Sequence, residues 1–388
     1  MKAMQDQHSG WRRELENRYV SSMIMGIRRA LAFSWKWRNG ATGIREEEVE
    51  VQRGDRPVPA TLFSPRHGWS PIPGWVVLHG VTRPGRHHPT LLRFVRALAG
   101  TGATVLVPEV PEWRELELAP DEAAATIRES VLYLAGREGT LSDRIGVMGF
   151  SLGVPQVLGA ATDPSLRGSL RCVAGFGGYG DLDRTVHFLF HGKHAWEGRV
   201  HQADPDPYGR WILGGNYLTR VPGFEDAEDV AHALLSLAKE AGDLQVGAWE
   251  ACYDSIKERL INHVHPSRHQ LFRAFAPPAG QAPPEGLGNR LARGLADAAR
   301  AATPYSEPLS FLDRIPVPVR LVHGRGDRLI PFSESLRLAE AFPPDADIRV
   351  YLTGLFSHSQ TDSSGGSGGW VEEQLHFLRI LSDLLTLV

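Results

Sequence analysis

Two kinds of apolar pattern along the chain predict the strands of a β-sheet. Two segments alternate apolar and polar positions on either side of a polar turn at Gly54 and Asp55, which is typical of an antiparallel strand pair. Continuous apolar runs follow, and stretches with helical periodicity separate them. Strands are predicted over residues 47–53, 57–64, 75–78, 104–108, 144–150 and 171–176, and helices over residues 90–98 and 121–134. Buried strands that alternate with helices indicate an α/β protein, in which helices cover both faces of a parallel sheet.

This alternation stops after residue 182 and resumes near residue 310. The intervening residues 183–309 have helical patterns but no convincing strand. A connection of this length without structure is implausible in a compact protein, so we predict a helical insertion. Strand and helix patterns return over residues 317–322, 333–342 and 348–351, before a last helix that starts near Trp370 and is expected to bury Val371, Leu375, Leu378 and Leu381. The sequence therefore predicts a core formed by residues 46–182 and 310–388.

Residues 1–45 form an N-terminal extension with the pattern of a long amphipathic helix. Large apolar residues recur every four positions, at Trp11, Leu15, Tyr19, Met23, Ile27, Leu31 and Trp35. One interpretation is that this face packs on the body of the chain or on a sister subunit in a homodimer. The other is weak attachment to a membrane surface through residues 11–37, because basic amphipathic helices bind there.

Composition argues against several classes of protein. The chain has 388 residues, 42% of them hydrophobic, and its formal net charge of −3 argues against a nucleic-acid partner. Cys172 and Cys252 are too few for a disulfide framework or a zinc ribbon, although a single bridge between them stays open. No apolar run approaches the roughly 18 residues of a membrane span. The N-terminus lacks a signal-peptide pattern, so we expect a cytoplasmic protein with no transmembrane segment.

The motif Gly149-Phe150-Ser151-Leu152-Gly153 is the strongest chemical signal. It follows the predicted strand at 144–150 and precedes a stretch compatible with a helix. A serine at a sharp strand-to-helix turn projects its hydroxyl above the sheet, and the flanking glycines avoid side-chain clashes in the crowded turn. The partial positive charge of a helix N-terminus favours an anion that develops there. Ser151 is therefore the predicted nucleophile, and the alternative is an ordinary tight turn.

A serine nucleophile needs a base, and the base needs an acid that orients it. Asp327 falls just past the predicted strand at 317–322, and His358 follows the next helix and strand. The order Ser151, Asp327, His358 along the chain is that of a catalytic triad on an open α/β sheet.

Other residues compete for these roles. Asp181 and Asp183 follow the strand at 171–176 and are rivals for the acid, although the motif Gly324…Asp327…Pro331 favours Asp327. His323 ends a buried strand, so we expect a hydrogen-bonded structural residue. The histidines of the insertion lack the carboxylate or cysteine spacing of a metal site and are expected to face solvent or substrate. They are His187, His191, His194, His263, His265 and His269.

An acyl-transfer site also needs two backbone N–H groups directed at the oxygen that gains charge. Leu152, directly after the nucleophile, is the first predicted donor. The loop after the strand at 75–78 is expected to supply the second, from Val81. In this loop Gly80 allows a close approach of the main chain, and His79 is expected to brace it.

These pieces together resemble the α/β-hydrolase superfamily. The resemblance is carried by His79-Gly80, the motif at 149–153, the stretch from Pro318 to Pro331, and Ser357-His358, and it covers about residues 46–182 and 310–388. It implies an eight-stranded, mostly parallel sheet, no cofactor, and a lid inserted after the sixth strand, where residues 183–309 stand. Within the superfamily the chain looks most like the esterase, lipase and dienelactone-hydrolase-like branches.

We therefore expect a serine hydrolase that cleaves a small-molecule carboxylic ester through an acyl-enzyme, with neither cofactor nor metal. One alternative is an acyltransferase, or an amidase or peptidase, that uses the same triad. Another is a non-catalytic binding protein on this fold, because fold alone does not fix function. Aromatic residues of the insertion are expected to offer apolar surface above the strand ends and to set substrate choice. They are Trp196, Tyr208, Trp211 and Tyr217.

Overall fold

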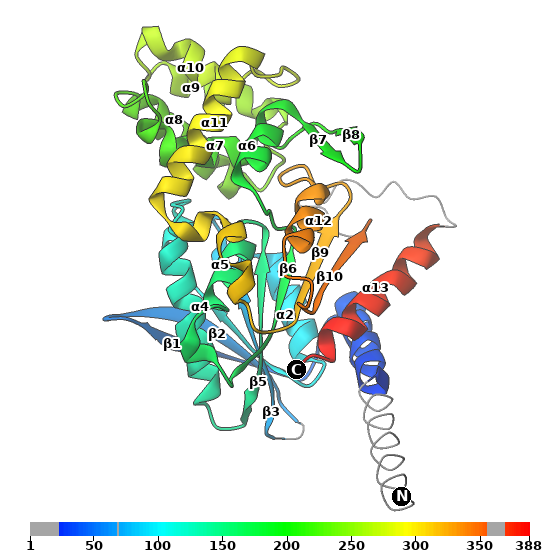
Figure 1. Ribbon diagram of the computed structural model, residues 1–388. Helices are drawn as coiled ribbons and strands as arrows, with labels where there is room; N and C mark the ends of the chain where they lie inside the picture. The colour runs from blue at the N-terminus through cyan, green and yellow to red at the C-terminus, as the bar shows by residue number, and fades with distance from the viewer. Residues whose placement is uncertain (1–22, 68–69, 355–368) are drawn as a thin grey trace, which may run out of the picture.

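The computed structural model describes residues 23–67, 70–354 and 369–388, which build an eight-stranded sheet with helices on both faces (Figure 1). The strand order is β1-β2-β4-β3-β5-β6-β9-β10. β2 pairs antiparallel with both of its neighbours, and the other adjacent strands are parallel. The strands are β1 (Ile44–Arg53), β2 (Arg56–Pro65), β3 (Ile72–Leu78), β4 (Thr104–Pro108), β5 (Thr140–Phe150), β6 (Leu170–Phe176), β9 (Val319–Gly324) and β10 (Ile348–Thr353). The predicted α/β class is confirmed.

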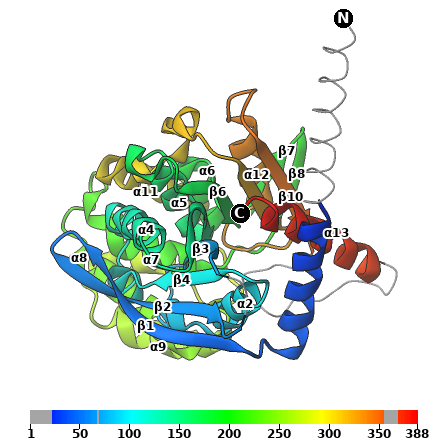
Figure 2. The same cartoon turned by 90° about the horizontal axis from the view of Figure 1, so that it is seen from below.

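Helices bury both faces of this sheet, which is why its central strands are apolar at successive positions. Along β3, Trp75 and Val77 belong to one buried cluster, and Val76 and Leu78 belong to the other. The first cluster lies under the N-terminal helix, α2 (Pro89–Ala99) and α13 (Gly369–Leu385), and the second under α4 (Pro120–Ala135), α5 (Val154–Ala160) and α12 (Phe332–Glu340). Seen from below, α2 and α4 lie on opposite sides of the strands (Figure 2).

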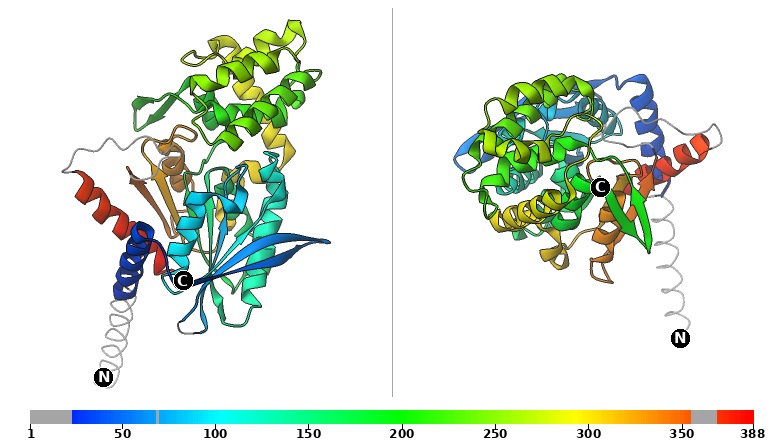
Figure 3. Two further views of the ribbon diagram at one scale, coloured as in Figure 1. Left: turned by 180° about the vertical axis from the view of Figure 1, so that it is seen from behind. Right: turned by 90° about the horizontal axis from the view of Figure 1, so that it is seen from above.

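A mostly helical insertion connects β6 to β9 and stands over the carboxyl ends of the strands (Figures 1 and 3). It contains α6 (Leu182–His191), β7 (Lys193–Trp196), β8 (Arg199–Gln202), α7 (Pro207–Tyr217), α8 (Glu228–Leu244), α9 (Asp254–Ile261), α10 (His269–Phe275) and α11 (Glu285–Ala302). The prediction that this segment lacks strands is wrong at the β7–β8 hairpin. Its two strands have four residues each, too few to give a clear alternation.

The buried apolar residues of the insertion form one continuous cluster with those on the α4, α5 and α12 side of the sheet. Trp211 on α7 is fully buried, and its Nε1–H donates to the carbonyl oxygen of Phe275 on α10 over 3.0 Å. The neighbouring Arg210 donates to the same oxygen over 2.6 Å. The prediction that Trp211 offers surface above the strand ends is therefore wrong, because this side chain holds the insertion together.

The described part of the N-terminal helix, residues 23–39, packs on the body of the chain. Ala30 and Phe33 are each only 1% exposed, and the Phe33 ring meets Phe94 of α2 edge to face at 5.2 Å. At the end of α13, Arg29 donates hydrogen bonds to the carbonyl oxygens of Leu385 and Val388. Packing on the chain itself is thus confirmed for this part of the helix.

The packed face differs from the predicted one. Four members of the predicted apolar series, Met23, Ile27, Leu31 and Trp35, are between 45% and 58% exposed. The helix instead turns its small residues inward, and a Cβ at Gly26 would come within 2.3 Å of the Thr386 side chain. Similarly, the prediction that α13 buries Leu375 is wrong, since 55% of that residue is exposed, whereas Leu381 is buried.

Two expectations about the whole chain can be compared with the described residues. Cys172 is buried and Cys252 is exposed, and both are free thiols, so no bridge joins them. Among the helices in the described ranges, none combines the length and apolar character that crossing a membrane requires.

Candidate active site

The chain has the α/β-hydrolase fold, in which the central strand β5 leads through a tight turn into a helix. β3, β5, β6 and β9 are neighbours and parallel, so their carboxyl ends meet at one edge of the sheet. Sites in open α/β sheets form at this edge. Here it lies beneath the insertion (Figure 1).

Ser151 occupies the turn at the end of β5. Its φ is +53°, in the left-handed region that non-glycine residues rarely adopt. A short 3-10 helix, Ser151–Gly153, starts at this residue and leads into α5. A Cβ at Gly149 would lie 2.7 Å from the carbonyl oxygen of Gly153, so the turn requires glycine there. A Cβ at Gly153 would lie 3.3 Å from the Leu78 side chain, a tight contact that a small shift would relieve. The predicted sharp strand-to-helix turn is confirmed.

Asp327 lies just past β9 and is 6% exposed. Its Oδ1 accepts hydrogen bonds from the N–H groups of Leu329 and Ile330, at 2.9 and 3.0 Å. Its Oδ2 lies 3.3 Å from Nε2 of His323. Two main-chain donors therefore fix the orientation of this carboxylate at the same edge of the sheet as Ser151.

His323 is the hydrogen-bonded structural residue that its position predicts. The ring is fully buried, with Nδ1 2.7 Å from the Ser335 hydroxyl and Nε2 2.9 Å from the carbonyl oxygen of Ile330. It connects the end of β9 to the loop after Asp327 and to α12.

The two rival aspartates have other partners. Asp181 is the N-cap of α6, where its Oδ1 accepts from the N–H of Arg184 at 2.8 Å. The carboxylate of Asp183 lies 2.7 Å from Arg300 of α11. Both side chains therefore take part in holding the first helix of the insertion.

His358 lies outside the residues that the structure describes. The chain on either side of it is anchored by one carboxylate: Glu373 of α13 accepts from the Thr353 hydroxyl and from the Gly354 N–H, each at 3.1 Å. The end of β10 and the first turns of α13 are therefore held together.

The histidines of the insertion form no metal site among the described residues, where no group of three or more His, Cys, Asp or Glu side chains is arranged to hold an ion. His194 packs the β7–β8 hairpin on α12, with Nδ1 3.0 Å from the Ser333 hydroxyl. Burial lowers the pKa of His194 to about 4, with a smaller contribution from His201. This histidine is therefore neutral near pH 7.

The loop after β3 carries the second predicted oxyanion donor, Val81. His79 is 1% exposed, and its Nδ1 lies 2.7 Å from the carbonyl oxygen of Gly80. Its Nε2 lies 3.0 Å from the N–H of Val110 and 2.9 Å from Oε1 of Glu109, so it accepts from the amide when neutral and pairs with the carboxylate when charged. In either state His79 ties this loop to the one after β4.

Glu109 places a negative charge beneath this loop. Burial raises the pKa of the carboxyl, but its pairing with His79 and the charges of Arg114 and Arg86 outweigh burial. The pKa of Glu109 therefore lies below its ordinary value, and the group is ionised near neutral pH.

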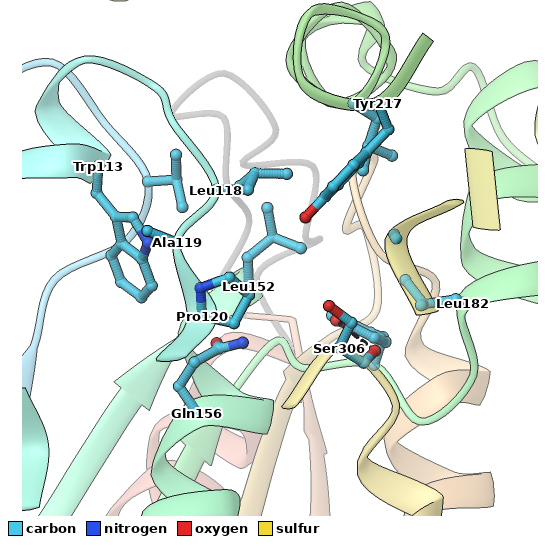
Figure 4. Close-up of a pocket in the computed structure, with 13 residues that line it drawn as sticks. Trp113, Leu118, Ala119, Pro120, Leu152, Gln156, Leu182, Tyr217 and Ser306 are labelled. Atoms are coloured by element: carbon cyan, nitrogen blue, oxygen red, sulfur yellow. Dashed lines mark hydrogen bonds between the residues drawn. The ribbon is translucent and has the colours of Figure 1, made fainter. Parts of the chain in front are cut away.

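A cavity opens beside the two predicted oxyanion donors, and the side chains of Val81 and Leu152 form part of its wall. Its volume is about 30 Å³. Core and insertion both contribute: the other lining residues are Trp113, Leu118, Ala119, Pro120, Gln156, Tyr179, Leu182, Leu213, Tyr217, Ala299 and Ser306 (Figure 4). Of the four insertion aromatics predicted to face the site, Tyr217 lines this cavity.

Sequence reasoning missed Gln156, whose side chain is 4% exposed in the cavity wall. The signal was present, because Gln156 is the single polar residue in the otherwise apolar helix Val154–Ala160 directly after the nucleophile motif. Ser306 had no comparable signal, since it reaches the cavity only through the path of the chain after α11.

Comparisons with known proteins give distant matches among solved structures. No protein-family model matches the chain, and no curated protein matches it in sequence. The solved structure of the 2,6-dihydroxy-pseudo-oxynicotine hydrolase is 18% identical over 87% of this chain and 68% of its own, with a TM-score of 0.46. Est1E from Butyrivibrio proteoclasticus is 12% identical over 88% of this chain and 98% of its own, with a TM-score of 0.46. The Pyrococcus horikoshii acylaminoacyl peptidase is 10% identical over 90% of this chain and 42% of its own, with a TM-score of 0.49.

Proposed function

We propose that the protein is a serine hydrolase that cleaves carboxylic esters through an acyl-enzyme, with Ser151 as nucleophile, His358 as general base and Asp327 as the acid that orients it. The backbone of Ser151 is the observation that carries this proposal. Its φ of +53° holds a non-glycine residue in a strained conformation at the end of the central strand. Strain of this kind clusters at functional sites, where surrounding structure maintains it.

In the proposed reaction, His358 takes the proton of the Ser151 hydroxyl as Oγ attacks the ester carbonyl carbon. The N–H groups of Leu152 and Val81 stabilise the oxyanion that forms. His358 then gives the proton to the departing alkoxide, and the acyl group stays on Ser151. His358 then takes a proton from a water molecule as the water oxygen attacks the acyl carbon, and it returns this proton to Oγ of Ser151 as the bond to the acyl group breaks. Asp327 holds the imidazole in the required tautomer and stabilises its charged form.

Residues 183–309 act as a lid in this proposal. They contribute Leu213, Tyr217, Ala299 and Ser306 to the cavity wall beside the oxyanion donors. A substrate in this cavity would lie between core and insertion, where water is displaced and electrostatic interactions strengthen. The lid would thereby set substrate choice.

The test compares p-nitrophenyl ester turnover by wild-type protein, Ser151→Ala and Ser165→Ala. Ser151→Ala should lose roughly 10³-fold or more in kcat, because without its nucleophile the site retains only binding and oxyanion stabilisation. Ser165 is an exposed serine outside the cavity, so its alanine variant should behave like wild type. Equal turnover by wild type and Ser151→Ala would contradict the proposal.

Two further measurements separate the alternatives. Adding competing alcohols or amines would reveal an acyltransferase through new ester or amide products, an outcome that exclusion of water from the cavity would favour. Covalent labelling of Ser151 by a fluorophosphonate would be incompatible with a non-catalytic binding protein.

A further inference from the structure

The cavity beside Val81 and Leu152 lies on one side of the proposed reaction centre. Its walls come from the loops after β3 and β4, from α5, and from the insertion with its return to the core. Among the described residues of 310–354, which carry Asp327, none lines it. In the proposed reaction the leaving group receives its proton from His358, and the strand that precedes His358 in the chain is β10, the edge strand beyond β9. The cavity is therefore placed for the acyl part of the ester.

Gln156 places an unpartnered acceptor in this cavity. Its Nε2 donates to the carbonyl oxygen of Tyr305 at 3.4 Å, so the opposite amide orientation would set two oxygens against each other. This contact uses Nε2 and therefore identifies the other amide atom as the oxygen Oε1. Oε1 is buried with no hydrogen-bond partner among the described residues. Figure 4 shows the amide end of Gln156 directed into the cavity. A buried carbonyl oxygen without a donor is costly, so a bound group that donates to it gains affinity.

The other residues that line the cavity favour an uncharged group beside Gln156. None of the 13 lining residues carries a charge. An ionised carboxylate or ammonium would lose its hydration there without a counter-ion, whereas an apolar group with one neutral donor would be fully matched. Tyr217 adds a second polar atom, and its hydroxyl also points into the cavity (Figure 4). Burial raises the pKa of Tyr217, so this hydroxyl stays neutral near pH 7.

We propose that the acyl group of the substrate is uncharged and mainly apolar, and that it carries a hydroxyl or N–H donor which binds Oε1 of Gln156. This inference rests on the proposed function, since it assigns the cavity to the acyl part of an ester. Gln156 is then a specificity-determining residue: it contacts the acyl group away from the scissile bond, and its loss changes which ester is preferred.

The experiment uses pairs of p-nitrophenyl esters of phenylalkanoic acids with one to three methylene groups, each bearing either a 4-hydroxyl or a 4-methyl substituent. The two substituents are similar in size, and the methylene groups insulate the ester carbonyl from their electronic effects. Wild-type protein should favour the hydroxyl ester roughly tenfold in kcat/KM at the chain length that reaches Gln156. Gln156→Leu should reduce this ratio to one or below by losing the hydroxyl substrate and gaining the methyl substrate. Gln202→Leu, on the exposed side of the β7–β8 hairpin, should keep the wild-type ratio.

Two results would overturn the inference. The first is a wild-type hydroxyl-to-methyl ratio of one or below at every chain length, which needs no variant and therefore holds even if Gln156→Leu fails to fold. The second is a hydroxyl preference that Gln156→Leu, folded and labelled by fluorophosphonate, leaves unchanged. In both cases ester turnover dependent on Ser151 would leave the proposed function intact. If wild-type protein neither turns over any ester nor is labelled at Ser151, the proposed function itself fails.

Discussion

Hydrogen bonds distinguish two aspartates that follow neighbouring strands. Asp327 follows β9, and two main-chain N–H groups hold one of its oxygens while the other faces His323. Asp181 follows β6 and caps α6. An N-cap aspartate can be replaced by asparagine at little cost, because the amide oxygen accepts the same hydrogen bond. An aspartate that orients a catalytic imidazole cannot, because the amide favours the wrong tautomer.

We therefore predict that Asp327→Asn lowers kcat for a p-nitrophenyl ester by roughly 10⁴-fold, and that Asp181→Asn changes kcat by no more than a few fold. Melting temperatures measured alongside should show both variants folded. A loss of activity in Asp181→Asn as large as that in Asp327→Asn would reverse the assignment of the acid.

Single residues differ in how far the sequence could predict them. Ser151 and the turn around it were predictable because glycines within two residues fix the local backbone. The position of Asp327 at this edge of the sheet was predictable because it follows the buried strand at 317–322 within a few residues. The unpartnered oxygen of Gln156 could not be foreseen, because it depends on where Tyr305, 149 positions away, accepts the amide N–H.

Among the elements, the N-terminal helix shows the limit of apolar periodicity. The pattern identified positions that share a face, but it did not reveal which face packs on the chain. Small residues decide this here, because Gly26 and Ala30 allow close contact with the end of α13 and bring Phe33 against α2. The large residues of the predicted face are left outside.

The apolar pattern alone would predict a larger loss of stability from replacing Leu31 than from replacing Phe33, and the structure predicts the reverse. Phe33→Ala should lower the free energy of unfolding by about 3 kcal/mol, since it removes a buried ring between two helices. Leu31→Ala, two residues away and 53% exposed, should change it by less than about 0.5 kcal/mol. Urea unfolding monitored by circular dichroism measures both. A larger loss for Leu31→Ala would indicate that the exposed face is covered in solution.

For the molecule as a whole, the main feature is a cavity that neither the core nor the insertion forms alone. Its lining residues range from Val81 to Ser306, and their proximity depends on how the insertion docks over the strand ends. Periodicity predicted an insertion after the sixth predicted strand, at 171–176, but the docking contacts join residues far apart in the chain. The shape of the cavity therefore could not be predicted from the sequence.

Leu213 of α7 offers a test of this joint cavity. It is 5% exposed and lines the wall from the insertion side. Leu213→Ala should raise kcat/KM for longer acyl esters relative to acetate, because the cavity becomes larger. Leu237→Ala, at a fully buried leucine of the insertion, should lower stability by about 2–5 kcal/mol without altering this profile. A panel of p-nitrophenyl esters of increasing chain length gives the readout, and identical profiles for both variants would argue against acyl binding here.

The carboxylate of Glu373 has a practical consequence for protein engineering. It joins Thr353 and Gly354 at the end of β10 to α13, so the two described elements that flank residues 355–368 in the chain are held together by contacts of their own. Lengthening a closed loop adds little entropy cost, since that cost grows only with the logarithm of its length. Insertions within residues 355–368 are therefore expected to leave the sheet and the nucleophile turn folded, and only those that keep the proposed base His358 in place would retain ester turnover.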